Sequence, residues 1–127
     1  MTHLEKAAAL RGDENMHYNC FQAVLLTFCE EYGLDPEVAL RSGTFLNAGM
    51  RSGATCGAVA GALAVLGLAG AEGPAAGELL RRFRERNGNL NCAQLLQSAK
   101  ERGEEKKPHC DRMVYDAVEM VEQILGQ

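Results

Sequence analysis

The chain has 127 residues, of which 46% are hydrophobic, and it carries a formal net charge of −4. This length predicts a single domain, residues 1–127, with enough apolar side chains to build a core. There is no basic patch, so nucleic acid is not an expected partner. No apolar run is long and hydrophobic enough to span a bilayer, and the N-terminus lacks the pattern of a signal peptide. We therefore expect a cytoplasmic protein without membrane insertion.

The first part of the chain predicts two short helices. An alanine-rich helix is expected over residues 4–10 and is broken at Gly12. Asn19 is a good N-terminal cap for a second helix over residues 20–32. Gly33 follows that run and suits the position just past a helix end.

A third helix and a loop follow. Asp35 and Pro36 supply a cap and a first-turn proline for a helix that reaches residue 40 or 41. Residues 42–53 contain three glycines and are expected to form a loop that can include one turn of helix.

The stretch over residues 53–67 is the most unusual in the chain, because it consists almost entirely of glycine, alanine and aliphatic residues. Gly57 and Gly61 lie one helical turn apart and share a face, where the absence of side chains lets another backbone come close. This pattern predicts a buried central helix that ends near residue 68.

Three more helices are predicted after it, over residues 75–86, 92–100 and 109–125. Asn89 or Asn91 caps the second of these. Residues 101–108 are charged and poor in apolar residues, which favours a solvated loop. No stretch alternates as a strand does. The predicted fold class is therefore all-α, a compact multi-helix bundle around the Gly/Ala-rich central helix.

Four of the five cysteines fall in the first turn of a predicted helix, on its apolar face: Cys20, Cys56, Cys92 and Cys110. Each one alone is consistent with packing, because cysteine is a small apolar residue. If the four helix starts meet in space, they bring thiols together at positive helix ends, which stabilise thiolates. Such a site suits a thiophilic metal ion, an iron–sulfur cluster or a redox thiol. Cys29 lies nine residues after Cys20, on the opposite side of the helix, and is expected to be structural.

The spacing of the cysteines excludes several familiar sites. No Cys-x-x-Cys pair occurs, and this pair is the signature of zinc ribbons, thioredoxin-like pairs and ferredoxin clusters. A shared site must therefore be assembled from distant segments. His109 is next to Cys110 and is a candidate ligand, a candidate thiol activator or an exposed loop residue. His17 precedes Cys20 by three residues and is a weaker candidate for the same site.

The run Cys-Gly-Ala-Val-Ala-Gly over residues 56–61 forms a CGAxxG motif. Together with Asn19-Cys20, Asn91-Cys92 and Cys110, it resembles the C_GCAxxG_C_C family of redox-active proteins. The resemblance extends over roughly residues 18–125. It implies that the family's four characteristic cysteines correspond to Cys20, Cys56, Cys92 and Cys110, and it leaves Cys29 outside the pattern.

Three functions are consistent with this sequence. The first is a small redox-active protein whose four cysteines, Cys20, Cys56, Cys92 and Cys110, bind a metal ion or an iron–sulfur cluster. The second is a thiol–disulfide redox protein in which Cys56 attacks and another of the four resolves. The third is a helical interaction module in which the cysteines only pack. A redox partner is expected but not identified, and the apolar rim of the central helix leaves a homodimer open.

Overall fold

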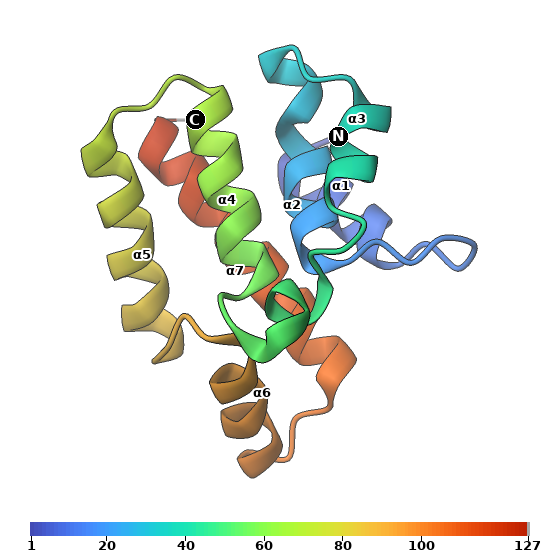
Figure 1. Ribbon diagram of the computed structural model, residues 1–127, viewed down its shortest axis with the longest axis vertical. Coiled ribbons are helices and arrows are strands. Elements are labelled where there is room, and N and C mark those ends of the chain that lie inside the picture. The colour runs from blue at the N-terminus through green and yellow to red at the C-terminus, as the bar shows by residue number, and fades with distance from the viewer. Residues whose placement is uncertain (127) are drawn as a thin grey trace.

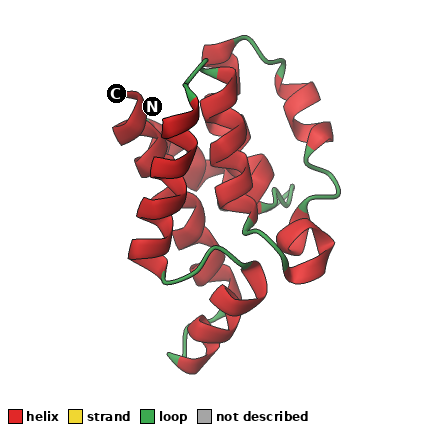
Figure 2. Ribbon diagram, turned by 60° about the vertical axis from the view of Figure 1, so that its left-hand side comes forward, coloured by secondary structure: helices red, strands yellow, loops and turns green. Residues whose placement is uncertain are grey.

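The computed structural model describes residues 1–126, which fold as a bundle of helices (Figures 1 and 2). Seven α-helices lie in this range: α1 (His3–Arg11), α2 (Cys20–Phe28), α3 (Pro36–Ser42), α4 (Gly57–Leu68), α5 (Gly73–Asn87), α6 (Cys92–Glu101) and α7 (Lys106–Leu125). A 3-10 turn, η1 (Cys29–Tyr32), extends α2, and a short turn, η2 (Gly49–Gly53), precedes α4. Within residues 1–126 there is no sheet, only an isolated antiparallel bridge between Thr55 and Asn91. The predicted all-α fold is confirmed.

The centre of the bundle is the packing of α4 against α2. A Cβ added at Gly61 would lie 3.0 Å from both the carbonyl oxygen of Phe21 and the Cβ of Val24. A Cβ at Gly57 would lie 3.1 Å from the backbone nitrogen of Phe21 and 3.3 Å from the Cβ of Cys20. The two glycines therefore let the backbones of α2 and α4 approach closely, as their spacing predicts, and this contact brings the start of α4 to the start of α2.

Capping residues define most helix ends as the sequence indicates. Asn19 accepts a hydrogen bond from the backbone N–H of Gln22, whose side chain accepts one in return from the N–H of Asn19. The side chain of Asp35 accepts a hydrogen bond from the backbone N–H of Glu37 at the start of α3, and that of Asn91 accepts one from Gln94 at the start of α6. Gly33 ends the α2–η1 segment in the left-handed conformation, which glycine adopts without steric cost.

The prediction for residues 101–108 is wrong, whereas the loop before α4 contains one turn of helix, as the sequence allowed. The solvated loop expected over residues 101–108 ends early, because α7 begins at Lys106 and includes Pro108 in its first turn. Proline is tolerated there, since the first N–H groups of a helix have no partner within the helix. In the loop before α4, η2 is a left-handed turn: Met50 and Arg51 have φ angles of 60° and 63°.

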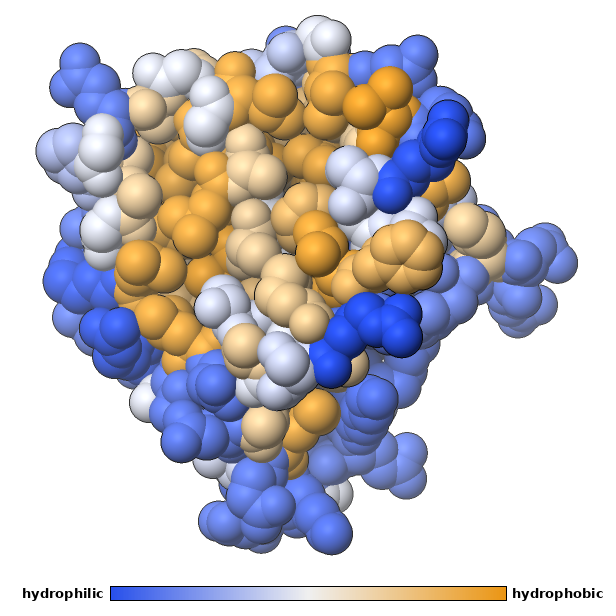
Figure 3. Space-filling view, in the orientation of Figure 1, coloured by the Kyte–Doolittle hydropathy of each residue, from blue (hydrophilic) through white to orange (hydrophobic). Residues whose placement is uncertain are grey.

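The surface over α4 is largely apolar (Figure 3). Leu68 is exposed at the end of this helix, and Leu63 and Ala64 are only partly buried. This is the apolar rim for which a homodimer was considered, and pairing of two copies stays a prediction. In the described part of the chain, no helix combines the length and the apolar character needed to cross a membrane.

Candidate functional site

One cavity, of about 390 Å³, lies where α2, α4, α6 and α7 come together at one end of the bundle. The four cysteines singled out by the sequence all line it: Cys20, Cys56, Cys92 and Cys110. Its walls also include apolar side chains, among them Leu46, Leu95 and Met113. Cys29 is fully buried elsewhere in the core and is not part of this cavity.

Cys20 is the first residue of α2, and the capping box around it fixes its position. Asn19, which is buried, donates from its side-chain amide to the carbonyl oxygen of Gly43 at 2.7 Å. Gln22 donates to the carbonyl oxygen of Leu40 at 2.8 Å. These bonds anchor the start of α2 to the end of α3, so that the Cys20 side chain is held at the cavity.

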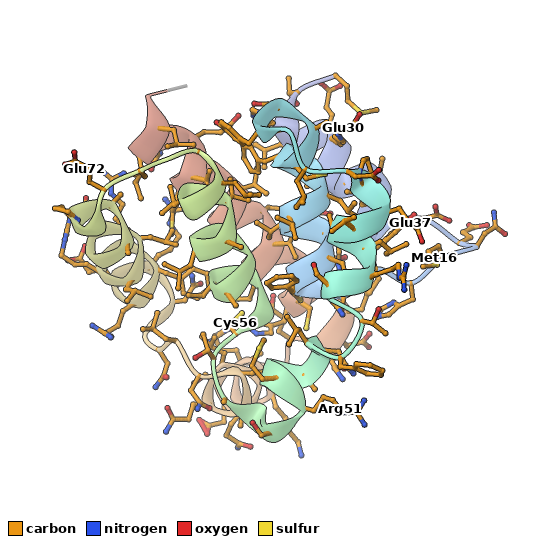
Figure 4. All side chains as sticks on the ribbon, turned by 45° about the horizontal axis from the view of Figure 1, so that its top comes forward. Met16, Glu30, Glu37, Arg51, Cys56 and Glu72 are labelled. Atoms are coloured by element: carbon orange, nitrogen blue, oxygen red, sulfur yellow. The ribbon has the colours of Figure 1, made fainter. Side chains whose placement is uncertain are left out.

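Cys56 and Cys92 are positioned by the isolated bridge between Thr55 and Asn91. The backbone N–H of Cys56 donates to the carbonyl oxygen of Leu90 at 2.8 Å, and that of Cys92 donates to Ala54 at 2.6 Å. Cys56 is the N-cap residue of α4 and Cys92 the first residue of α6. Figure 4 shows Cys56 at the start of α4, above the turn that carries Arg51.

Cys110 differs from the other three, because it lies in the second turn of α7 rather than at its start. The expectation that all four cysteines occupy first helical turns is therefore wrong for this residue, since α7 begins earlier than predicted. Cys20 and Cys110 are in contact: the Sγ of Cys20 lies 3.9 Å from the carbonyl oxygen of Cys110, and the Cys20 thiol hydrogen-bonds the Cys110 side chain.

Residues 18–124 match the model of a family described as "Putative redox-active protein (C_GCAxxG_C_C)". The chain belongs to this family. The match covers all four cavity cysteines and confirms the resemblance drawn from the CGAxxG motif. No curated protein and no solved structure matches the chain.

In this member of the C_GCAxxG_C_C family the two contacting thiols have opposite acidities. The hydrogen bond from Cys20, followed by the positive charges of Arg11 and Lys106, lowers the pKa of Cys110 to about 7 although burial opposes it. The same hydrogen bond, together with burial and the charge of Cys110, raises the pKa of Cys20 well above its ordinary value. Cys110 is therefore the thiol of this pair that ionises first.

Cys56 is less acidic than its place at a helix start suggests. Burial raises its pKa to about 11, although the backbone N–H groups of Ala58 and Val59 act in the other direction. The stabilisation expected from the helix end is present, but the cost of burying the charge is larger. Burial and the neighbouring charge of Cys110 also raise the pKa of Cys92.

Two polar residues of the site were not singled out from the sequence. Arg11, at the end of α1, lines the cavity with a buried side chain, and its charge acts on both Cys20 and Cys110. Lys106 lies in the segment expected to be a loop. Nothing in the sequence distinguishes Arg11 from an ordinary cation at a helix C-terminus, where positive charge is generally favourable.

Two of the three histidines line the cavity. His109 lines the cavity and is buried, with a pKa that burial lowers, so it is neutral at pH 7. It is therefore not the exposed loop residue that was one of the alternatives. His17 also lines the cavity, whereas His3 packs on Phe28, with ring centroids 4.2 Å apart.

The cysteines, in their present positions, do not form a metal site together with other ligand-type side chains of residues 1–126. Within residues 1–126, no three side chains of His, Cys, Asp or Glu are grouped so that they could hold one metal ion. All five cysteines are free thiols. The four cavity cysteines thus share a cavity, but their positions do not form the donor set of a metal ion or cluster.

Proposed function

We propose that this protein exchanges thiols and disulfides in the cavity, with Cys110 as the attacking thiolate and Cys20 as the resolving thiol. The observation that carries the proposal is the contact of Cys20 with Cys110, in which the Cys20 Sγ lies 3.9 Å from the Cys110 carbonyl oxygen, within a cavity large enough for a small molecule. Cavities of a few hundred Å³ with mainly apolar walls are typical of small-molecule sites. The family description, which names redox activity, supports the same class of function.

Cys110 is the better nucleophile of the candidates. Its pKa is lowered to about 7, so much of it is thiolate near neutral pH. The pKa of Cys56 is raised to about 11, which keeps that thiol protonated there. The thiolate is the reactive form in exchange with a disulfide. We therefore assign the attack to Cys110, and not to Cys56 as first expected.

The reaction proceeds in two exchanges. The Cys110 thiolate attacks one sulfur of a substrate disulfide, a Cys110–substrate bond forms, the substrate S–S bond breaks, and the first substrate thiolate leaves and takes up a proton. The Cys20 thiolate then attacks the Cys110 sulfur, the Cys20–Cys110 disulfide forms, and the second substrate thiolate leaves. The protein dithiol loses two electrons and two protons, and the substrate disulfide gains them.

The first exchange also activates Cys20. Before it, the hydrogen bond to Cys110 and the negative charge of Cys110 both keep the Cys20 proton in place. Once Cys110 is bound to substrate it has no charge and no longer competes for the proton, while the positive charge of Arg11, which lowers the pKa of Cys20, remains. Resolution by Cys20 therefore becomes easier only after the mixed disulfide has formed.

The experiment uses protein purified without oxygen, stripped of metal and reacted with hydroxyethyl disulfide as an uncharged probe. We expect Cys110→Ser to abolish the fast reaction, and Cys20→Ser to accumulate a mixed disulfide on Cys110 that intact-mass analysis detects. Cys29→Ser is the matched control, because Cys29 is buried outside the cavity, and it should react like the unmodified protein. Equal reaction of Cys110→Ser and the unmodified protein would refute the proposal.

Binding of a metal ion or an iron–sulfur cluster by Cys20, Cys56, Cys92 and Cys110 is a second candidate, favoured by the fact that one cavity contains all four thiols. It requires the thiols to move together, since their present positions do not form a ligand set. An absorption spectrum and elemental analysis of protein purified without oxygen separate the candidates. Iron with sulfide, or stoichiometric zinc, that is lost on substitution of any of the four cysteines would favour the metal site. Metal-free protein that resists reconstitution would favour thiol exchange.

A further inference from the structure

Cys56 and Cys92 each follow one partner of the isolated bridge, and the reaction above does not use them. Thr55 and Asn91 face each other in the isolated bridge, and the N–H groups of Cys56 and Cys92 form the two hydrogen bonds that flank it. In an antiparallel pair with this hydrogen-bond pattern, the residues that follow each bridge partner lie diagonally opposite each other. Because side chains alternate along extended segments, both point to the same side, and that side is the cavity.

In regular antiparallel geometry, the backbones of Cys56 and Cys92 would lie slightly farther apart than a disulfide requires. Diagonal neighbours in an antiparallel pair lie about 7–8 Å apart between Cα atoms. Disulfides are usually formed at Cα separations of about 4.4–6.8 Å, so a shift of about 1 Å joins them. A single bridge resists such a shift less than a continuous ladder does, and no further bridge lies beside this one within residues 1–126.

Cys110 lines the same cavity as both members of this second pair, Cys56 and Cys92. Its negative charge acts on Cys56 and on Cys92, as it does on Cys20. Cys92 is the more accessible member, because it is partly exposed while Cys56 is buried. Lys106 lies beside the same cavity, and its positive charge acts on both Cys92 and Cys110.

We propose that Cys56 and Cys92 are a second redox dithiol, which takes over the disulfide from the Cys20–Cys110 pair and returns that pair to its reduced form. This inference rests on the proposed function, because the first pair must be oxidised by substrate before it can pass the disulfide on.

The transfer needs no reagent from outside the protein. The Cys92 thiolate attacks the Cys110 sulfur, the Cys92–Cys110 bond forms, and Cys20 leaves as a thiolate. The Cys56 thiolate then attacks the Cys92 sulfur, the Cys56–Cys92 bond forms, and Cys110 leaves as a thiolate. The protons of the second pair pass to the first. A fully reduced protein can therefore reduce two substrate disulfides, and four electrons leave its thiols.

The test oxidises the whole reduced protein with hydroxyethyl disulfide, stops the reaction with acid at successive times, alkylates the free thiols and maps the disulfides by mass spectrometry. Of the five thiols of the chain, one is expected to remain at completion, that of Cys29, with Cys20 joined to Cys110 and Cys56 joined to Cys92. With a single equivalent of probe, the Cys20–Cys110 disulfide should decline while Cys56–Cys92 grows, at a rate independent of protein concentration.

Three variants make the outcome decisive. Cys92→Ser, and Cys92→Ala if the first variant folds poorly by circular dichroism, should consume one equivalent of probe instead of two while retaining the Cys20–Cys110 disulfide. Cys29→Ser should still consume two. Cys110→Ser should form Cys56–Cys92 at least about tenfold more slowly, because the relay through its sulfur is lost.

Two results would overturn the inference. In the first, the Cys20–Cys110 disulfide forms completely while Cys56 and Cys92 are still free thiols that become alkylated after the quench. This result leaves the proposed function intact. In the second, the Cys56–Cys92 disulfide forms as fast in Cys110→Ser as in the unmodified protein. This result would show that the disulfide does not pass through Cys110. Failure of Cys20–Cys110 to form in the unmodified protein would instead refute the proposed function.

Discussion

The guanidinium of Arg11 and the carboxylate of Asp111 are joined by a hydrogen bond of 2.6 Å from Nε to Oδ1. The arginine also donates to the carbonyl oxygen of Tyr18 at 2.8 Å, and its side chain is only 4% exposed. The bond ties α1 to α7 one residue after Cys110. Arg11 precedes the residues 18–124 that match the family model, so part of the electrostatic environment of the cavity comes from outside the matched region.

Replacing Arg11 with glutamine should make Cys110 less acidic. The charge of Arg11 is one of the causes that lower the pKa of Cys110, and glutamine removes it. We expect the midpoint of the alkylation rate against pH to move upward. Loss of a buried ion pair should also lower the free energy of unfolding, by about 1–3 kcal/mol, since Lys107 still binds Asp111. Arg81→Gln, at an exposed position on α5, is the control and should change neither quantity. An unchanged alkylation midpoint in Arg11→Gln would contradict this role.

The acidity of Cys110 should depend on a proton donor at position 20. The hydrogen bond from Cys20 is the largest cause that lowers the pKa of Cys110. Cys20→Ala removes the donor and should raise that pKa clearly, whereas the hydroxyl of Cys20→Ser can still donate and should raise it less. The measurement is alkylation of Cys110 against pH, followed by mass spectrometry. Identical curves for the alanine and serine variants would show that the hydrogen bond is not the cause.

Gly61 and Gly67 should respond oppositely to alanine. At Gly61 a new Cβ meets the backbone oxygen of Phe21 at 3.0 Å, so α2 and α4 must separate. We expect a loss of about 1–3 kcal/mol of unfolding free energy, offset in part by the better helix propensity of alanine. At Gly67 nothing lies within 4 Å, and alanine should stabilise by about 0.5–1 kcal/mol. Denaturant unfolding measures both, and a stabilised Gly61→Ala would disprove the close packing of these helices.

His3 should make stability depend on pH. Its ring nitrogens bind Glu122, with Nδ1 2.7 Å from Oε2, and Glu31. Burial lowers the pKa of His3, but the two carboxylates together outweigh it and leave the pKa raised above 6.5. The protonated ring therefore stabilises the fold fully below about pH 6.5, and this contribution is lost as the pH rises through the folded-state value.

The measurement for His3 is the difference in unfolding free energy between the unmodified protein and His3→Gln, from about pH 5 to 9. This difference should shrink as the pH rises. Taking the difference matters because the lowered pKa of His109 acts in the opposite direction and destabilises the fold at low pH. A difference that stays constant or grows with pH would contradict the ion pairs of His3.

Local signals in the sequence were sufficient for the all-α fold class and for most helix positions. Asn19 and Asn91 cap the helices expected of them, because a short side-chain oxygen can reach the free N–H groups of the first turn. The spacing of Gly57 and Gly61 predicted the close α2–α4 contact for the same kind of local reason. The start of α7 was missed, since a charged run with a proline resembles a loop although proline also fits a first helical turn.

The sequence singled out the four cysteines that line the cavity, but it did not indicate their acidities. Which thiol ionises depends on contacts between residues distant in the chain, such as Cys20 with Cys110 and Arg11 with both. No pattern of spacing encodes these contacts. The start of α4 does lower the pKa of Cys56, as its position predicts, but burial raises it by more, and burial depends on the whole fold.

The most direct test of this account is to identify the first disulfide that forms when reduced, metal-free protein meets less than one equivalent of hydroxyethyl disulfide. Acid quenching within the first turnover, alkylation and peptide mapping provide the answer. The account predicts a link between Cys20 and Cys110, with Cys29, Cys56 and Cys92 still alkylated as free thiols. A first product that links Cys56 to substrate or to another cysteine, with Cys110 still free, would contradict it.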